Sequence, residues 1–197
     1  KIEKKLSKYL DEDRFQHTMG VMYTSACLAM VHGYDIKDAQ VSGLLHDCAK
    51  CIPNKKKLKM CSEHNIPVSD FERSHPFLLH SRLGAYIAHE KYGIDDQEIL
   101  SAINYHTTGR REMSLLEKII YIADYIEPMR YKASRLPEIR KLAFEDLDEC
   151  MYEILKDTLE YLEENPKEID STTRDAYVYY KELHDRKMQD AANRQED

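Results

Sequence analysis

The sequence predicts an all-α protein, folded as a single compact helical bundle. Apolar residues recur at steps of three and four along most of the chain, which places them on one face of an α-helix. Within the stretch 13–31 they fall at Phe15, Met19, Met22, Ala26 and Ala29. No run shows sustained two-residue alternation rich in Val, Ile and Thr, the pattern of a half-buried strand.

The helices are expected in the following order. The first spans 13–31, and the second opens at Asp35, whose side chain is a suitable N-cap. The others are expected at 54–65, 79–92, 95–106, 114–127, 136–164 and 171–188. Glycines stand where helices should end, at Gly33, Gly93 and Gly109. Prolines mark turns at Pro53, Pro76 and Pro128.

Length and composition predict one domain over 1–188 and a frayed polar tail over 189–197. The formal net charge of -7 argues against a nucleic acid polymer or an anionic membrane as partner. No stretch approaches the roughly 20 apolar residues of a membrane-spanning helix. The five cysteines include one C-x-x-C, Cys48 and Cys51, but no second pair that would favour zinc or redox chemistry. Their odd number, with no signal peptide, predicts a cytoplasmic protein.

An adjacent histidine and aspartate, His46 and Asp47, stand in the otherwise apolar stretch Val-Ser-Gly-Leu-Leu-His-Asp-Cys-Ala-Lys that ends at Lys50. Burying an ionised carboxylate costs several kcal/mol or more unless a charge or a metal compensates it. The rest of the chain must therefore supply a partner for Asp47.

Further candidate ligands occur in similarly apolar settings, at His17, His80, His106 and Asp124. Each of them alone is more often a structural residue, but together with the His46–Asp47 pair they favour a metal site. Six nitrogen and oxygen donors without a thiolate exceed one tetrahedral zinc site, and they suit iron, manganese or magnesium, singly or in pairs. Two metals about 3.5–4 Å apart would need a bridging carboxylate. Asp47, next to a ligand histidine, is placed to bridge.

These residues lie in motifs that resemble a known family. The motifs are Arg-Phe-Gln-His-Thr from Arg14, Leu-Leu-His-Asp-Cys-Ala-Lys up to Lys50, Leu-His-Ser around His80, His-Thr-Thr-Gly-Arg from His106, and Ile-Ala-Asp-Tyr-Ile-Glu-Pro-Met-Arg up to Arg130. From about residue 5 to residue 183 the chain is similar to the YqeK-type HD-domain phosphohydrolases. These are symmetrical bis(5'-nucleosyl)-tetraphosphatases, which split diadenosine tetraphosphate into two ADP.

The resemblance implies a helical bundle of the HD-domain type and a centre of two metals, iron in that family, with manganese as an alternative. The ligands of the first metal would be His17, His46, Asp47 and Asp124. Those of the second would be His80 and His106, with Asp47 shared. We expect a hydroxide activated by both metals to attack a phosphorus, with no protein nucleophile.

Asp47 and Lys50 are the expected catalytic residues, because Lys50 lies one helical turn beyond His46 and can reach a phosphate oxygen. Arg14 shares a helix face with His17, so both are expected to contact substrate. Further candidate contacts adjoin the ligand segments or begin the last helix: Thr107, Thr108, Arg110, Arg130 and Thr172. The sequence of Asp170 to Thr173 is typical of a helix N-cap, and its amides could also meet an anion.

Two other functions remain open at this point. One is a different HD-type nucleotide phosphohydrolase, such as a nucleotidase or a nucleoside triphosphate hydrolase. The other is a non-enzymatic helical module that binds a metal or a nucleotide. The long C-terminal helices could pack on the core or on a second copy, so a homodimer is open as well.

Overall fold

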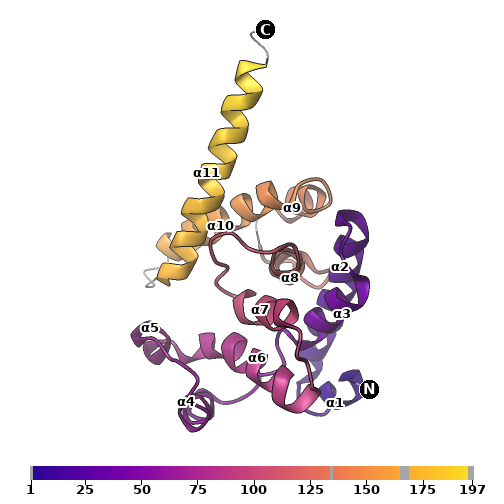
Figure 1. Cartoon of the computed structure of the whole chain (residues 1–197), viewed down its shortest axis with the longest axis vertical. Helices are drawn as coiled ribbons and strands as arrows, with labels where there is room; N and C mark the ends of the chain where they lie inside the picture. The colour runs from indigo at the N-terminus through magenta and orange to yellow at the C-terminus, as the bar shows by residue number, and fades with distance from the viewer. Residues whose placement is uncertain (1, 134, 165–168, 195–197) are drawn as a thin grey trace.

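The computed structural model describes residues 2–133, 135–164 and 169–194, which form helices and turns without any strand (Figure 1). The predicted all-α class is therefore confirmed. The helices are α1 (Ile2–Leu6), α2 (Glu12–His32), α3 (Ile36–Leu45), α4 (Asn54–Glu63), α5 (Asp70–Ser74), the 3-10 helix η1 (Pro76–Leu78), α6 (Leu79–Tyr92), α7 (Gln97–Tyr105), α8 (Leu115–Ile126), α9 (Leu136–Ala143), α10 (Leu147–Glu164) and α11 (Ser171–Asn193).

Helix α8 is the centre of the bundle. It starts with a capping box, in which the Ser114 side chain accepts the Glu117 backbone N–H and the Glu117 carboxylate accepts the Ser114 N–H. Beyond this turn the helix is apolar on nearly all sides, and it packs against α2, α3, α7, α9 and α10 (Figure 1). A carboxylate on this helix, such as Asp124, is therefore held by the rigid core of the fold.

Helices α2 and α3 approach each other closely at Gly43. A Cβ added at Gly43 would lie 2.9 Å from the Cα of Met22 and 3.1 Å from Ser25 Oγ. The absence of a side chain at this position therefore sets the spacing of the two helices. Because α2 carries His17 and α3 leads directly into His46, the same contact fixes the distance between two candidate ligands.

We expect Gly43→Ala to lower the free energy of unfolding by about 1–3 kcal/mol, since the added methyl group meets the backbone of α2. Thermal unfolding measures this as a fall in Tm of about 2–4 °C per kcal/mol in a domain of this size. Gly84→Ala is the matched control, because a Cβ there would first meet Ile103 at 3.4 Å, the limit of ordinary contact. Equal Tm values for the two variants would contradict the proposed close approach.

Several predicted helix ends are confirmed. Gly33 and Gly93 end α2 and α6 in the left-handed conformation, with φ of 73° and 70°. Asp35 caps α3 by accepting two backbone N–H groups, and Asp170 caps α11 through the N–H of Thr172. Gly109 also has a positive φ, but it closes the turn after α7.

The single helix expected at 136–164 is two helices, α9 and α10. The chain leaves α9 at Phe144, and the Asp146 side chain then accepts the backbone N–H of Glu149 to begin α10. Apolar spacing continues across this break, so periodicity alone did not reveal it. The short helices α1, α5 and η1 were not predicted either.

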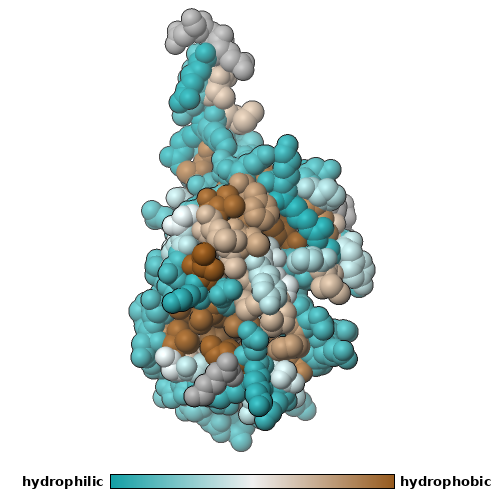
Figure 2. All heavy atoms as spheres, turned by 90° about the vertical axis from the view of Figure 1, so that its right-hand side faces the viewer, coloured by the Kyte–Doolittle hydropathy of each residue, from teal (hydrophilic) through white to brown (hydrophobic). Residues whose placement is uncertain are grey.

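Helix α11 runs to Asn193, five residues past the expected end at 188. Its C-terminal part projects from the bundle (Figure 1), and the residues along this projection are mostly hydrophilic (Figure 2). The first residues of the predicted polar tail are thus helical, and 195–197 lie outside the described residues. None of the described helices combines the length and apolar character needed to cross a bilayer.

Candidate metal centre

The predicted ligands converge from five helices. His17 lies in α2, His80 in the first turn of α6 and Asp124 in α8, whereas His46 and His106 directly follow the last residues of α3 and α7. Their ligand atoms form three overlapping groups, within each of which all atoms lie within 4.8 Å of one another. The structure therefore brings together all six residues expected to bind metal, with Asp47 following His46.

Three of the histidines are oriented by their own helical turns. Each Nδ1 lies at hydrogen-bond distance from the carbonyl oxygen three residues earlier: His46 from Gly43 O at 2.6 Å, His80 from Phe77 O at 2.6 Å and His106 from Ile103 O at 2.7 Å. A carbonyl can only accept, so Nδ1 carries the proton and Nε2 of the neutral ring presents a lone pair.

The Nε2 atoms of four histidines face one another in two pairs. His46 Nε2 lies 3.3 Å from His17 Nε2, and His80 Nε2 lies 3.2 Å from His106 Nε2. Burial lowers the pKa of His46 to about 4 and that of His80 to about 4, despite the nearby Asp47 carboxylate. Imidazole Nε2 atoms that face each other in this way are suited to share a cation, which binds the unprotonated nitrogen.

Asp47 lies between the two pairs of histidines, with only 1% of its surface exposed. Its Oδ2 is 3.5 Å from His46 Nε2 and 3.9 Å from His17 Nε2, whereas its Oδ1 is 3.2 Å from His80 Nε2 and 3.5 Å from His106 Nε2. Each oxygen thus faces one pair, as a carboxylate shared between two metals must.

The electrostatics of Asp47 agree with this arrangement. Burial opposes ionisation, but the His46, His106 and His80 rings and the Lys50 ammonium group around the carboxylate hold the pKa of Asp47 well below its usual range. Its Oδ1 is fully buried and has no well-formed hydrogen bond, although nitrogen atoms surround it. An orphaned anionic oxygen beside inward-facing imidazoles fits a bound divalent cation.

The second candidate carboxylate ligand, Asp124, completes the half of the centre formed by α2 and α8. Asp124 Oδ1 lies 3.0 Å from His17 Nε2, and the pKa of Asp124 is held well below its usual range because His17, His46 and Arg130 outweigh burial. The His17 ring is buried, yet hydrogen bonds to Asp124 and Glu127 raise its pKa.

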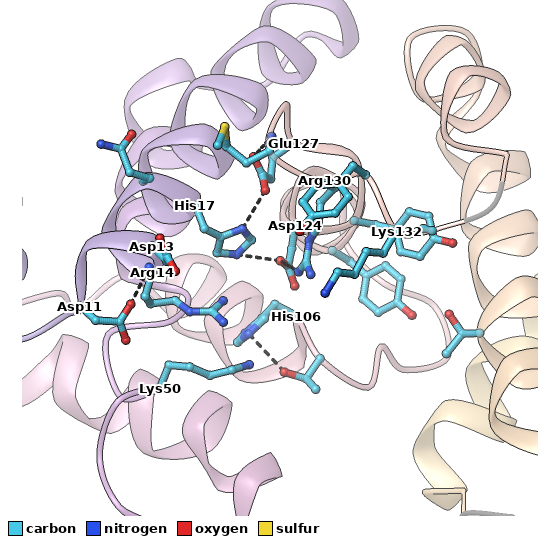
Figure 3. A pocket seen from close by; sticks show the side chains of 18 residues that line it. Asp11, Asp13, Arg14, His17, Lys50, His106, Asp124, Glu127, Arg130 and Lys132 are labelled. Carbon is cyan, nitrogen blue, oxygen red and sulfur yellow. Dashed lines mark hydrogen bonds and ion pairs between the residues drawn. The ribbon is translucent and has the colours of Figure 1, made fainter. Parts of the chain in front are cut away.

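Glu127 also contacts the centre, although its position in the sequence did not predict a functional role. Its side chain is buried, and its Oε1 accepts the Nδ1–H of His17 at 3.0 Å, so it fixes the orientation of this ligand (Figure 3). Gly20 provides the necessary space, because a Cβ there would lie 2.5 Å from Glu127 Oε2. A sequence feature that could have indicated this role is the position of Glu127 three residues after Asp124, on the same side of the end of α8.

Three cations contact the ligands in a cavity of about 890 Å³ (Figure 3). Arg14 Nη1 lies 2.7 Å from Asp47 Oδ2, and Arg130 Nη2 lies 2.7 Å from Asp124 Oδ1. Lys50 Nζ is 3.0 Å from His80 Nε2 and 3.5 Å from Asp47 Oδ1. Thr107 also lines the cavity, with its hydroxyl 3.1 Å from His80 Nε2.

Three other predicted substrate contacts lie elsewhere. Arg110 forms a two-pronged ion pair with the buried Glu117, at 3.0 and 2.9 Å. Thr108 and Thr172 line a separate cavity of about 160 Å³. The structure therefore does not bring these three residues to the metal centre, and a role for them in substrate binding stays a prediction.

The comparisons with known proteins agree with this geometry. The family model of the HD domain matches residues 14–129. The symmetrical bis(5'-nucleosyl)-tetraphosphatase of Bacillus subtilis is 40% identical over 157 residues, which cover 80% of this chain and 83% of the relative. That of Staphylococcus aureus is 36% identical over 180 residues, covering 90% and 92%.

A solved structure has the same fold. It is a Clostridium acetobutylicum protein described as a predicted HD superfamily hydrolase involved in NAD metabolism, and it is 38% identical with a TM-score of 0.89, over 92% of this chain and 96% of that one. The present chain therefore belongs to the HD-domain hydrolases. Within them it is a member of the symmetrical bis(5'-nucleosyl)-tetraphosphatase family, as its motifs predicted.

Proposed function

We propose that this protein hydrolyses diadenosine tetraphosphate symmetrically into two ADP, with two metal ions, iron or manganese, in the centre. The observation that carries the proposal is the position of Asp47, one oxygen facing each pair of histidines, on a cavity lined by four cationic side chains. The names of the relatives from B. subtilis and S. aureus supply the substrate class.

The bound cations would lower the pKa of a water molecule and stabilise negative charge on the reacting phosphoryl group. His17, His46, Asp47 and Asp124 would hold one metal, and His80 and His106, with Asp47 shared, would hold the other. Two of the three groups that the distances define support this division, His17 with His46 and Asp47, and Asp47 with His80 and His106, while the third joins His46 and Asp124 to His106.

The cations of the cavity are proposed to bind the polyphosphate. Arg14, Lys50 and Arg130 now contact carboxylates or imidazoles of the centre. A metal ion bound to those ligands would compensate their charge, and the three side chains would then be available for phosphate oxygens. The planar guanidinium groups can each contact two such oxygens.

The nucleoside ends are proposed to contact the aromatic wall of the cavity. Tyr121 and Tyr125 lie three residues before and one residue after Asp124 on α8, and all three line the cavity together with the exposed Tyr131. Tyrosine rings stack on any base and their hydroxyls can meet ribose, so they suit a nucleoside without restricting the base.

We also propose a cytoplasmic location and a small-molecule partner. The five cysteines are free thiols, which suits the reducing cytoplasm. The net charge of -7 and the local grouping of cations suit a small polyphosphate better than a nucleic acid polymer. Light scattering on the purified chain would test the homodimer that the sequence leaves open.

The decisive experiment uses protein loaded with Fe²⁺ or Mn²⁺ without oxygen and incubated with diadenosine tetraphosphate. We expect ADP as the only nucleotide product, separated and quantified by ion-exchange chromatography, and two metals per chain by elemental analysis. ATP with AMP would contradict symmetrical cleavage. Release of phosphate or nucleoside from mononucleotides alone would favour another HD-type phosphohydrolase instead.

We expect Lys50→Ala to lower kcat/KM for diadenosine tetraphosphate by about 10–100-fold, since a hydrogen bond to a charged group contributes about 1.5–3 kcal/mol. Steady-state kinetics at saturating metal measure this loss. Lys55→Ala is the matched control, because Lys55 is an exposed lysine of α4. Equal kcat/KM values for the two variants would remove Lys50 from the proposed site.

A further inference from the structure

The turn that follows α8, Glu127–Arg130, carries two side chains that contact the centre. Glu127 accepts the Nδ1–H of His17 at 3.0 Å, and the Arg130 guanidinium lies 2.7 Å from Asp124 Oδ1. Both contacts belong to the half of the centre formed by α2 and α8. The placement of this turn therefore decides how His17 and Asp124 face each other.

A single side chain of α9 holds the backbone of this turn. Arg140 Nε donates to the carbonyl oxygen of Ile126 at 2.9 Å, and its Nη2 donates to those of Glu127 at 3.0 Å and Arg130 at 2.9 Å. Among the side chains described in residues 2–133, 135–163 and 169–194, no carboxylate forms an ion pair with Arg140. Its guanidinium therefore acts on the carbonyl groups of this turn.

Arg140 holds the backbone of this turn, and further contacts fix the conformation of the Glu127 side chain. Its Oε2 accepts the N–H of Met129 at 2.6 Å and lies against Gly20, where even a methyl group would approach to 2.5 Å. Its Oε1 is left for the His17 ring. A chain of direct contacts thus runs from Arg140 through the backbone and carboxylate of Glu127 to His17.

We infer that Arg140 is a positioning residue for the metal held by His17 and Asp124. The inference rests on the proposed metal-dependent function, and it assigns a role to a residue that lies beyond the stretch matched by the HD-domain model, 14–129. The turn does not contact the other half of the centre, where His80 and His106 are oriented by carbonyl groups of their own helices.

A purely structural role predicts a different result. Arg140 satisfies carbonyl groups at the C-terminal end of α8, which would stabilise the helix even if no metal were bound. Loss of such a cap lowers Tm but gives no reason for one metal to be weakened more than the other. A positioning role weakens the metal of His17 and Asp124 selectively.

The test is calorimetric titration of the metal-free chain, residues 1–197, with Mn²⁺, for the wild type, Arg140→Lys, Arg140→Ala and Glu127→Gln. We expect one of the two Mn²⁺ dissociation constants to rise by about 10–100-fold in each variant, with the other changed by less than about threefold. Arg140→Lys should weaken Mn²⁺ binding as Arg140→Ala does, because an ammonium group lacks the planar fork that reaches three carbonyl groups.

Lys141→Ala is the matched control, since Lys141 is the next residue of α9, 78% exposed at its side chain, and contacts Glu145 on the surface. It should leave both dissociation constants unchanged. If Arg140→Ala does not fold, Arg140→Lys and Glu127→Gln still decide the question.

If both Mn²⁺ dissociation constants are unchanged in Arg140→Lys and Glu127→Gln, or if both rise equally, the positioning role is overturned and the proposed function is not. Absence of Mn²⁺ binding by the wild type would overturn both this inference and the proposed function. Selective weakening in a protein that does not hydrolyse diadenosine tetraphosphate would support the inference and overturn only the proposed substrate.

Discussion

Replacing Asp47 with asparagine should reduce hydrolysis of diadenosine tetraphosphate at least about 1000-fold, because loss of metal-assisted charge stabilisation costs several kcal/mol of the barrier. The amide keeps the size of the side chain but cannot supply two anionic oxygens, one for each half of the centre. The variant should also retain fewer than two metals per chain.

Product formation followed by chromatography, with elemental analysis of the same samples, measures both effects. Asp95→Asn is the control, since the Asp95 side chain is 86% exposed and pairs with His89 on the surface. Asp47→Asn protein that retains two metals and near wild-type turnover would contradict the shared-carboxylate arrangement. Hydrolysis that does not depend on Asp47 would arise outside this centre, and that result would favour a module that binds metal without catalysis.

Removal of the metals should lower the stability of the fold without unfolding it. A ligand present at 100 times its dissociation constant stabilises the native state by about 2.7 kcal/mol. For a domain of this size, that corresponds to a Tm decrease of roughly 5–10 °C for each metal removed. Scanning calorimetry before and after chelation measures the change, and elemental analysis verifies the removal.

The His80→Ala variant provides an internal comparison. It lacks a ligand of one half of the centre, so chelation should shift its Tm by less than it shifts that of the wild type. The metal-free protein should remain folded, because Arg14, Lys50 and Arg130 still compensate the carboxylates. A Tm that does not respond to verified metal removal would contradict the two-metal model.

The six proposed ligands could be identified from the sequence because their chemistry conflicts with their surroundings. Asp47 and Asp124 interrupt apolar stretches, where a carboxylate without a partner is costly. The same reasoning could not identify Glu127, which stands before a proline at a helix end and resembles an ordinary surface residue until the fold buries it.

Proximity in sequence was a poorer guide to the substrate contacts. Arg14, Lys50 and Arg130 are near ligands in the chain and reach the cavity. Arg110 is equally near His106, but the turn after α7 directs it to Glu117. The break between α9 and α10 was missed for a related reason, since hydrogen bonds of Asp146, and not a change in apolar spacing, produce it.

The four histidines of the centre differ in how far along the chain the group that orients each ring lies. His46, His80 and His106 each bond to a carbonyl group only three residues away, so any segment that forms the helical turn also aims the ring. His17 depends on Glu127, 110 residues further along the chain. Three of the proposed ligands are therefore oriented by local structure. The fourth acquires its orientation only when distant parts of the chain have come together, so substitutions far from it in sequence can alter it.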